Sequence, residues 1–161
     1  MKQNIVEVIV YLLEMTAIRS FESDDRLCDR DLVQQRLEDA GFSDEVVAST
    51  FDWLKELIEQ KSWCASVGDD DNASRTFRVF SQEEQARISM EVRSFILSLE
   101  YSGILDTRMR EVVISQLIEL DQDVVELIDA KWVILLVMMS GSNDNIKNMR
   151  SYLLATMALE V

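Results

Sequence analysis

The chain contains no proline and only four glycines among its 161 residues. Proline ends or kinks helices and glycine supplies most tight turns, so the residues that usually interrupt helical segments are scarce. Residues 75–80 alternate polar and apolar side chains. One short extended segment cannot form a sheet by itself. The sequence therefore predicts an all-α fold with at most one short extended segment, at 75–80.

Apolar residues recur with helical spacing in about seven segments of the chain. We predict helices at 4–19, 29–40, 43–60, 81–103, 106–120, 123–140 and 145–159. The second half of the sixth segment, from Trp132 to Met139, is apolar all round. Such a pattern is typical of a helix surrounded by other helices. We therefore expect a compact bundle with the 123–140 helix at its centre.

Several of these segments carry capping signals at their ends. Gly41 is placed to end the second helix in a left-handed conformation. Ser43 and Asp106 are N-cap residues for the helices that follow them. Ser81 and Glu84 have the spacing of a capping box.

The length of the chain predicts a single domain over residues 1–161. Within it we expect a helical hairpin at 29–60 and the main helical bundle at 81–159. Between them, the run Gly68-Asp69-Asp70-Asp71-Asn72 indicates a solvated acidic loop at 61–74.

Missing residue types and motifs exclude several chemistries. The chain has no histidine, which excludes Ser-His-Asp and Cys-His catalysis and the usual two-histidine metal sites. Neither GxxxxGK[ST] nor GxGxxG occurs, and the acidic loop lacks the spacing of a calcium-binding EF-hand. Cys28 and Cys64 have no CxxC spacing. We expect no cofactor and no metal, and the sequence favours a non-catalytic protein without deciding the question.

The charge is strongly acidic, with 30 acidic against 16 basic residues and a formal net charge of −14. A field of this sign repels nucleic-acid phosphates and anionic membranes, and it favours basic partners or simple solubility. The longest apolar run, 132–139, is much shorter than the ~20 residues of a membrane span. The N-terminus does not resemble a signal peptide. We therefore expect a cytoplasmic protein that does not enter membranes.

Helical hairpin 29–60 has a helix–Gly–Phe–helix spacing around Gly41 and Phe42. This spacing resembles the three-helix repeats of the RecX recombination regulators and helix-turn-helix proteins, although any tight helical hairpin shares it. Its second helix carries Lys55 but mostly acidic residues, whereas nucleic-acid readers need a basic face. The resemblance makes a nucleic-acid-associated regulator the alternative function, and the acidic side chains of the second helix count against it.

A second resemblance covers nearly the whole chain. The matching stretches are Tyr11–Glu14, Ala40–Phe42, Trp53-Leu54, Arg78–Ser81 with Glu84, Arg93–Leu97, Leu99-Glu100, Gly103–Asp106, Arg110–Ile114, Leu120-Asp121 and Ala130–Leu135. Together they resemble the bacterial Smg proteins. The 64–74 segment does not match, and Met139-Ser140-Gly141 lacks an expected proline. The resemblance implies a cytosolic bacterial protein with no assigned activity, and it carries over no catalytic residue.

Two groups of charged residues are candidates for docking a partner. Arg110, Glu111 and Asp121 lie in the Smg-like stretches at positions that core packing does not require, so we expect them to be exposed. A cluster of acidic residues surrounds the start of the 123–140 helix: Glu119, Asp121, Asp123, Glu126 and Asp129. The cluster could bind a basic partner, although compensation of the helix dipole also explains it.

Lys131 is the remaining candidate for chemistry. If buried, it could be a nucleophile, but a lysine whose stem reaches to the surface is the commoner arrangement. The leading hypothesis is a non-catalytic adaptor or regulator that acts through protein–protein interaction. The sequence identifies neither the partner nor the process, and it does not decide whether the chain forms homo-oligomers.

Overall fold

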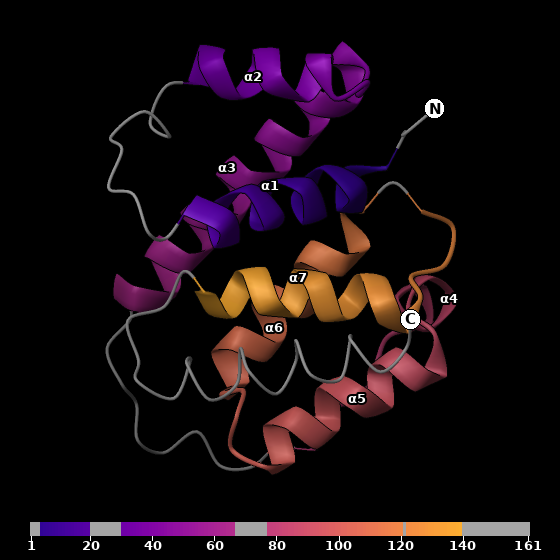
Figure 1. Cartoon of the computed structure of the whole chain (residues 1–161). Helices are drawn as coiled ribbons and strands as arrows, with labels where there is room; N and C mark the ends of the chain where they lie inside the picture. Colours follow the sequence, from indigo (N-terminus) through magenta and orange to yellow (C-terminus); the bar gives the residue numbers. More distant parts are fainter. Residues whose placement is uncertain (1–3, 20–29, 67–76, 121, 140–161) are drawn as a thin grey trace. The chain divides into compact units, whose positions relative to one another are not determined.

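The computed structural model describes residues 4–19, 30–66, 77–120 and 122–139 (Figure 1). This part of the chain is helical and contains no strand, which confirms the predicted all-α fold. Its seven helices are α1 (Ile5–Arg19), α2 (Arg30–Asp39), α3 (Asp44–Ser66), α4 (Gln82–Arg87), α5 (Met90–Tyr101), α6 (Thr107–Ile118) and α7 (Leu127–Met139). The helix predicted at 145–159 lies outside the described residues.

The single helix predicted over 81–103 is two helices, α4 and α5. Between them, Ile88 has an extended backbone and forms a parallel bridge with Val125, whose N–H donates to the Arg87 carbonyl at 2.8 Å. Ser89 then begins α5 by accepting a hydrogen bond from the Val92 N–H. The prediction was wrong because Ile88 and Val92 keep helical spacing across the break.

Two other predicted boundaries also differ from the structure. Helix α3 continues to Ser66, so the first part of the loop predicted at 61–74 is helical. No glycine or proline occurs between Gly41 and Gly68 to stop the helix earlier. The acidic run at 69–72 lies outside the described residues. Helix α7 begins at Leu127 rather than near Asp123, with the Glu126 carbonyl accepting the first backbone hydrogen bond from Ala130.

The chain forms two compact units, residues 1–55 and 56–161, so α3 contributes to both. The single domain predicted over 1–161 stays a prediction. The core of the first unit comes from α1, α2 and the start of α3, through Val8, Val33, Leu37, Phe42 and Val47.

Helix α2 ends as the sequence predicts. Gly41 has φ +93°, its N–H donates to the Glu38 carbonyl, and the Phe42 N–H donates to the Leu37 carbonyl. This pair of bonds is a Schellman motif, whose left-handed position favours glycine. Phe42 is thereby turned into the same core as Leu37, where the Tyr11 ring packs edge-on at 5.7 Å.

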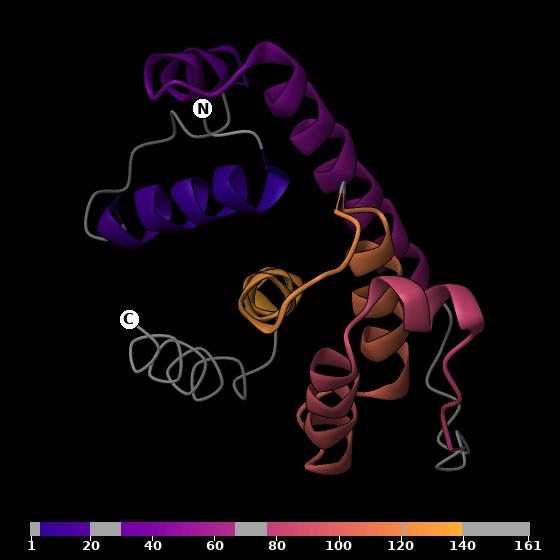
Figure 2. The ribbon, with the colours of Figure 1, turned by 90° about the vertical axis from the view of Figure 1, so that its right-hand side faces the viewer.

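In the second unit, α6 contacts α4, α5 and α7, and α5 also contacts α7. Figure 2 looks along α7 and shows α5 and α6 side by side. Helix α7 is buried on most sides, as predicted, through Ala130, Val133, Ile134, Leu135, Val137 and Met138. Among the described helices, none is long and apolar enough to cross a membrane.

Candidate functional site

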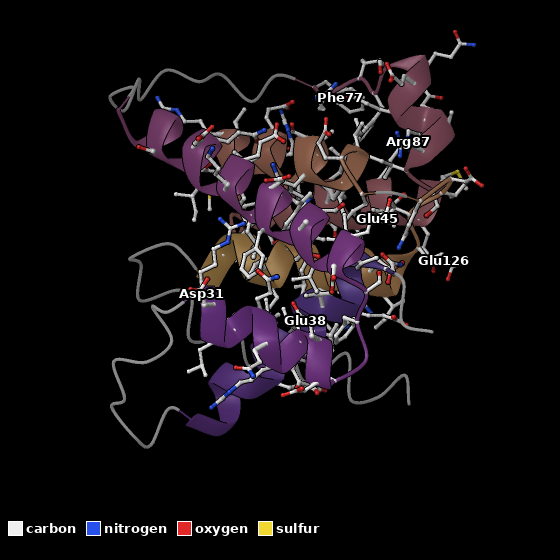
Figure 3. All side chains as sticks on the ribbon, turned by 90° about the horizontal axis from the view of Figure 1, so that it is seen from above. Asp31, Glu38, Glu45, Phe77, Arg87 and Glu126 are labelled. Atoms are coloured by element: carbon white, nitrogen blue, oxygen red, sulfur yellow. The ribbon has the colours of Figure 1, made fainter. Side chains whose placement is uncertain are left out.

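The side chains of residues 77–80, which precede α4, alternate between solvent and interior. Phe77 and Val79 are 92% and 73% exposed, whereas Phe80 is buried and Arg78 is largely covered. This alternation is typical of extended backbone. Figure 3 labels Phe77 where the described chain resumes after α3, and Arg87 within α4. The segment therefore covers most of an arginine side chain and leaves two apolar side chains in water.

Phe80 attaches this segment to the bundle. The guanidinium of Arg78 lies 5.3 Å from the centre of the Phe80 ring, and that of Arg93 from α5 lies 5.8 Å from it. Both distances allow attraction between a cation and the face of an aromatic ring.

The predicted capping box at the start of α4 is present. The Ser81 hydroxyl accepts a hydrogen bond from the Glu84 N–H, and the Glu84 carboxylate accepts one from the Ser81 N–H at 2.6 Å. Arg78 donates to the same carboxylate, also at 2.6 Å. Burial raises the pKa of Glu84, but the bonds from Ser81 and Arg78 outweigh it, so the pKa lies below its usual value.

The lowered pKa of Glu84 makes the stability of the fold depend on pH. The ionised carboxylate contributes stability above the pKa of an unfolded glutamate, ~4.3, and this contribution is lost as the pH falls through the lower folded pKa. We expect Glu84→Gln to destabilise the protein at pH 7, and the difference from the parent to shrink on acidification. Urea unfolding at a series of pH values measures this. Glu83→Gln, an exposed carboxylate of the same turn, is the control, and a difference independent of pH would contradict the assignment.

Arg110, in the first turn of α6, is the centre of an ion-pair network. Its side chain is 4% exposed. It donates to Glu100 at the end of α5 and, at 2.9 and 2.6 Å, to one oxygen of Glu111. That oxygen also accepts from Arg78 Nε at 3.0 Å, which joins Arg78 and Glu84 to the network. The expectation that Arg110 is exposed was therefore wrong, whereas Glu111 is exposed, as expected.

Both arginines in this network remain charged. Burial lowers the pKa of Arg110, but its hydrogen bonds to Glu100 and Glu111 raise the pKa by more than burial lowers it. The pKa of Arg110 therefore lies above its ordinary value. The pKa of Arg78 is raised in the same way, against burial, by Glu84 and Glu111. The network thus ties the 77–80 segment, α4, α5 and α6 together.

The turn after α5 makes this network geometrically feasible. Gly103 has φ +76°, and its N–H donates to the Glu100 carbonyl while the Ile104 N–H donates to the Leu99 carbonyl. This is a second Schellman motif. Asp106 then caps α6, as predicted, by accepting from the Met109 N–H at 2.7 Å. The tight reversal brings Glu100, near the end of α5, to Arg110 in the first turn of α6.

A surface pocket of about 600 Å³ lies beside the network. Its lining comes from the 77–80 segment and the end of α5, through Phe77, Arg78, Leu97, Ser98, Glu100, Tyr101 and Gly103. Tyr101 is 91% exposed, so two large aromatic side chains, Phe77 and Tyr101, border the pocket almost fully in water. We call this site the aromatic pocket.

The structure describes four of the five predicted docking residues, and it does not bring these four together into one cluster. Arg110 and Glu111 begin α6, whereas Glu119 follows its last turn, about 14 Å further along the helix at 1.5 Å per residue. Asp123 is exposed in the linker before α7, and Asp121 lies outside the described residues. The explanation by the helix dipole fits Glu126 and Asp129, which lie at the start of α7, but not Glu119, which lies at the C-terminal end of α6, where negative charge is disfavoured.

Lys131 does not carry its amine to the surface. It is 2% exposed, and its Nζ lies 6.0 Å from the centre of the Phe95 ring. It is not part of the lining of the aromatic pocket.

Sequence reasoning missed Phe77 and Tyr101. The signal for Tyr101 was present, because it falls outside the apolar face that Val92, Ile96 and Leu99 form on α5. An aromatic residue away from the buried face of a helix is a candidate for contact with a partner.

Comparison with known proteins places the chain in a family. A family described as "Protein of unknown function (DUF494)" matches residues 5–159. A Protein Smg homolog of Alkalilimnicola ehrlichii is 40% identical, over 86% of this chain and 83% of the relative. The homolog of Methylococcus capsulatus is 35% identical, over 91% and 88% of the two chains. The chain belongs to the Smg family. The resemblance predicted from the sequence is thus confirmed.

A third Smg homolog, from Stenotrophomonas maltophilia, is 39% identical over 86% of this chain and 83% of its own. No solved structure matches the chain. The match to the family includes every residue of the aromatic pocket and of the ion-pair network.

Proposed function

We propose that this Smg-family chain is a cytoplasmic, non-catalytic adaptor or regulatory protein that binds another protein through the aromatic pocket. The observation that carries the proposal is the pair Phe77 and Tyr101, both more than 90% exposed at the edge of a pocket. Exposed aromatic side chains are costly to leave in water and are enriched at the centres of protein interfaces.

The surroundings of the pocket support docking rather than turnover. Its charged groups, Arg78 and Glu100, are engaged in ion pairs with other side chains of the network. The described lining contains neither histidine nor cysteine, and the hydroxyl of Ser98, its one serine, donates to the Phe95 carbonyl rather than to a base. An ordered network beneath exposed aromatics is instead suited to present them in a fixed geometry, which lowers the entropic cost of binding.

The alternative, a nucleic-acid-associated regulator using the α2–α3 hairpin, has less support. The exposed charged side chains of α2 and the first turns of α3 are mainly acidic, including Asp31, Glu38, Asp39, Asp44 and Glu45. Arg30 is placed over the Phe51 ring, at 5.0 Å from its centre. Phosphate contacts need a basic face.

Comparative affinity capture tests the proposed function. The native protein and the double variant Phe77→Ala/Tyr101→Ala would be used to capture partners from cells of its own organism, with mass spectrometry as the readout. We expect the double variant to lose the specific partners. Its stability should stay within about 0.5 kcal/mol, because both side chains are exposed.

Two control variants make the capture experiment decisive. Met90→Ala removes another exposed apolar side chain, 74% exposed, from the opposite end of α5, and it should retain every partner. Glu119→Lys/Asp123→Lys tests the acidic residues around the α6–α7 linker. If only this charge-reversed variant loses partners, the docking face is the linker and the aromatic pocket is not the site.

A further inference from the structure

We infer that the aromatic pocket accommodates a cationic side chain, an arginine or a lysine, from a basic segment of the partner protein. This inference rests on the proposed function and specifies the chemistry of the partner. It follows from the aromatic rings, the charge balance around the pocket and the charge of the whole chain.

The first observation is the pair of aromatic rings at the edge of the pocket. Phe77 and Tyr101 border it from the 77–80 segment and from the end of α5, and both rings are almost fully exposed. A cation against an aromatic face is attracted by the negative potential of the ring. The same segment already uses this interaction internally, since the Phe80 ring has the guanidiniums of Arg78 and Arg93 at 5.3 and 5.8 Å.

The second observation is the carboxylate of Glu100 in the lining. Its Oε1 accepts from Arg110 Nη1, and among the described residues its Oε2 has no hydrogen-bond partner. A carboxylate can accept several hydrogen bonds at once, so Glu100 can receive an incoming guanidinium or ammonium without releasing Arg110.

Arg78, the cation of the lining, does not cancel this attraction. Its guanidinium is bound by Glu84 and Glu111. The network contains three carboxylates, Glu84, Glu100 and Glu111, against two guanidiniums, so one negative charge remains in excess. Arg93 approaches the Phe80 ring but forms no ion pair with the three carboxylates of the network, so it does not offset their charge directly. An anionic occupant would meet this excess, and a neutral apolar one would remove Glu100 from water without replacing its hydrogen bonds.

The third observation is the net charge of −14. A field of this size attracts basic segments over long distances and raises their association rate at low salt. The pocket then supplies specificity, because it selects one cationic side chain of such a segment through short-range contacts.

Binding of matched peptides to the whole chain tests this inference. The probes are short capped peptides that differ only in the central residue of a Val-X-Val sequence: arginine, its neutral isostere citrulline, or apolar norleucine. Fluorescence anisotropy gives the affinities, and the aromatic NMR resonances of Phe77 and Tyr101 report the place of binding. We expect the arginine peptide to shift both resonances and to bind roughly 5- to 30-fold more tightly than the citrulline peptide.

Two variants assign the effect to the pocket. Phe77→Ala/Tyr101→Ala should abolish the preference for arginine, and Glu100→Gln should reduce it while preserving an acceptor for Arg110. Circular dichroism and thermal unfolding check that both variants fold. Because Phe77 and Tyr101 are exposed, the double variant keeps the test valid even if Glu100→Gln is unstable.

The outcomes separate this inference from the proposed function. Equal binding of the arginine and citrulline peptides, tighter binding of norleucine, or no binding at millimolar concentration would overturn the cationic occupant. The adaptor function would still stand in each case if the double variant loses its captured partners. If the double variant retains those partners, the proposed function fails, whatever the peptides show.

Discussion

Leu135→Ala in α7 should lower the free energy of unfolding by about 2–5 kcal/mol. Leu135 is 3% exposed, and its neighbours Ile134 and Val137 are completely buried. Removing a buried leucine side chain loses its transfer free energy and leaves a cavity that close-packed neighbours fill only partly. The loss should be at the upper end of this range if the surrounding helices cannot move inward.

Chemical denaturation of the parent and variant chains, followed by circular dichroism, measures this loss. Ile128→Ala is the matched control, because Ile128 lies on the same helix but is 38% exposed. Ile128→Ala should lower the free energy of unfolding by much less than Leu135→Ala. A loss below about 1 kcal/mol for Leu135→Ala would mean that α7 is not a central helix and that its apolar face serves a partner instead.

The burial of α7 could be predicted because the signal is local and unusually strong. From Trp132 to Met139 every residue is apolar, and only a helix surrounded by protein can shield all of its faces. The helix ends were also predictable, because their signals are local too. Gly41, Ser81 and Asp106 lie next to the backbone groups that they satisfy, so sequence spacing alone specifies the contact.

The break between α4 and α5 could not be predicted from local spacing. Ile88 leaves the helical conformation to pair with Val125, far away in the sequence, and Arg87 donates to the carbonyls of Leu120 and Gln122. The Val125 N–H, which donates to the Arg87 carbonyl at 2.8 Å, replaces a backbone hydrogen bond that the break removes from the helix. Because the partners belong to the α6–α7 linker, the break depends on tertiary structure.

The candidate site was only partly predictable. Arg110 and Glu111 were identified, but their role as the centre of an ion-pair network was not. The apolar–polar alternation of Phe77, Arg78 and Val79 favours burial of the apolar side chains, whereas the structure covers most of the arginine side chain instead. The reversal arises because Arg78 meets Glu84 and Glu111, and the second of these partners belongs to another helix.

Arg110→Met should cost about 2–4 kcal/mol of unfolding free energy, the second large effect expected in this chain. Methionine preserves most of the buried volume but removes the hydrogen bonds to Glu100 and Glu111. Loss of one partner of a buried ion pair costs about 3–5 kcal/mol, because the remaining charge is left without compensation. The value expected here is lower, since Glu100 and Glu111 are 24% and 46% exposed and water can solvate them in part.

Arg78→Met is the matched comparison, because Arg78 shares Glu111 with Arg110 but is more exposed, 19% against 4%. We expect Arg78→Met to cost about 1 kcal/mol of unfolding free energy, and this cost to depend more strongly on salt, since exposed ion pairs are screened more than buried ones. Urea unfolding of both variants at low and high ionic strength measures the two effects. If both variants lose the same small amount of unfolding free energy, and neither loses any in high salt, the network is a set of surface ion pairs. It could then not hold the aromatic pocket in a fixed geometry, and the pocket would lose the preorganisation that favours binding.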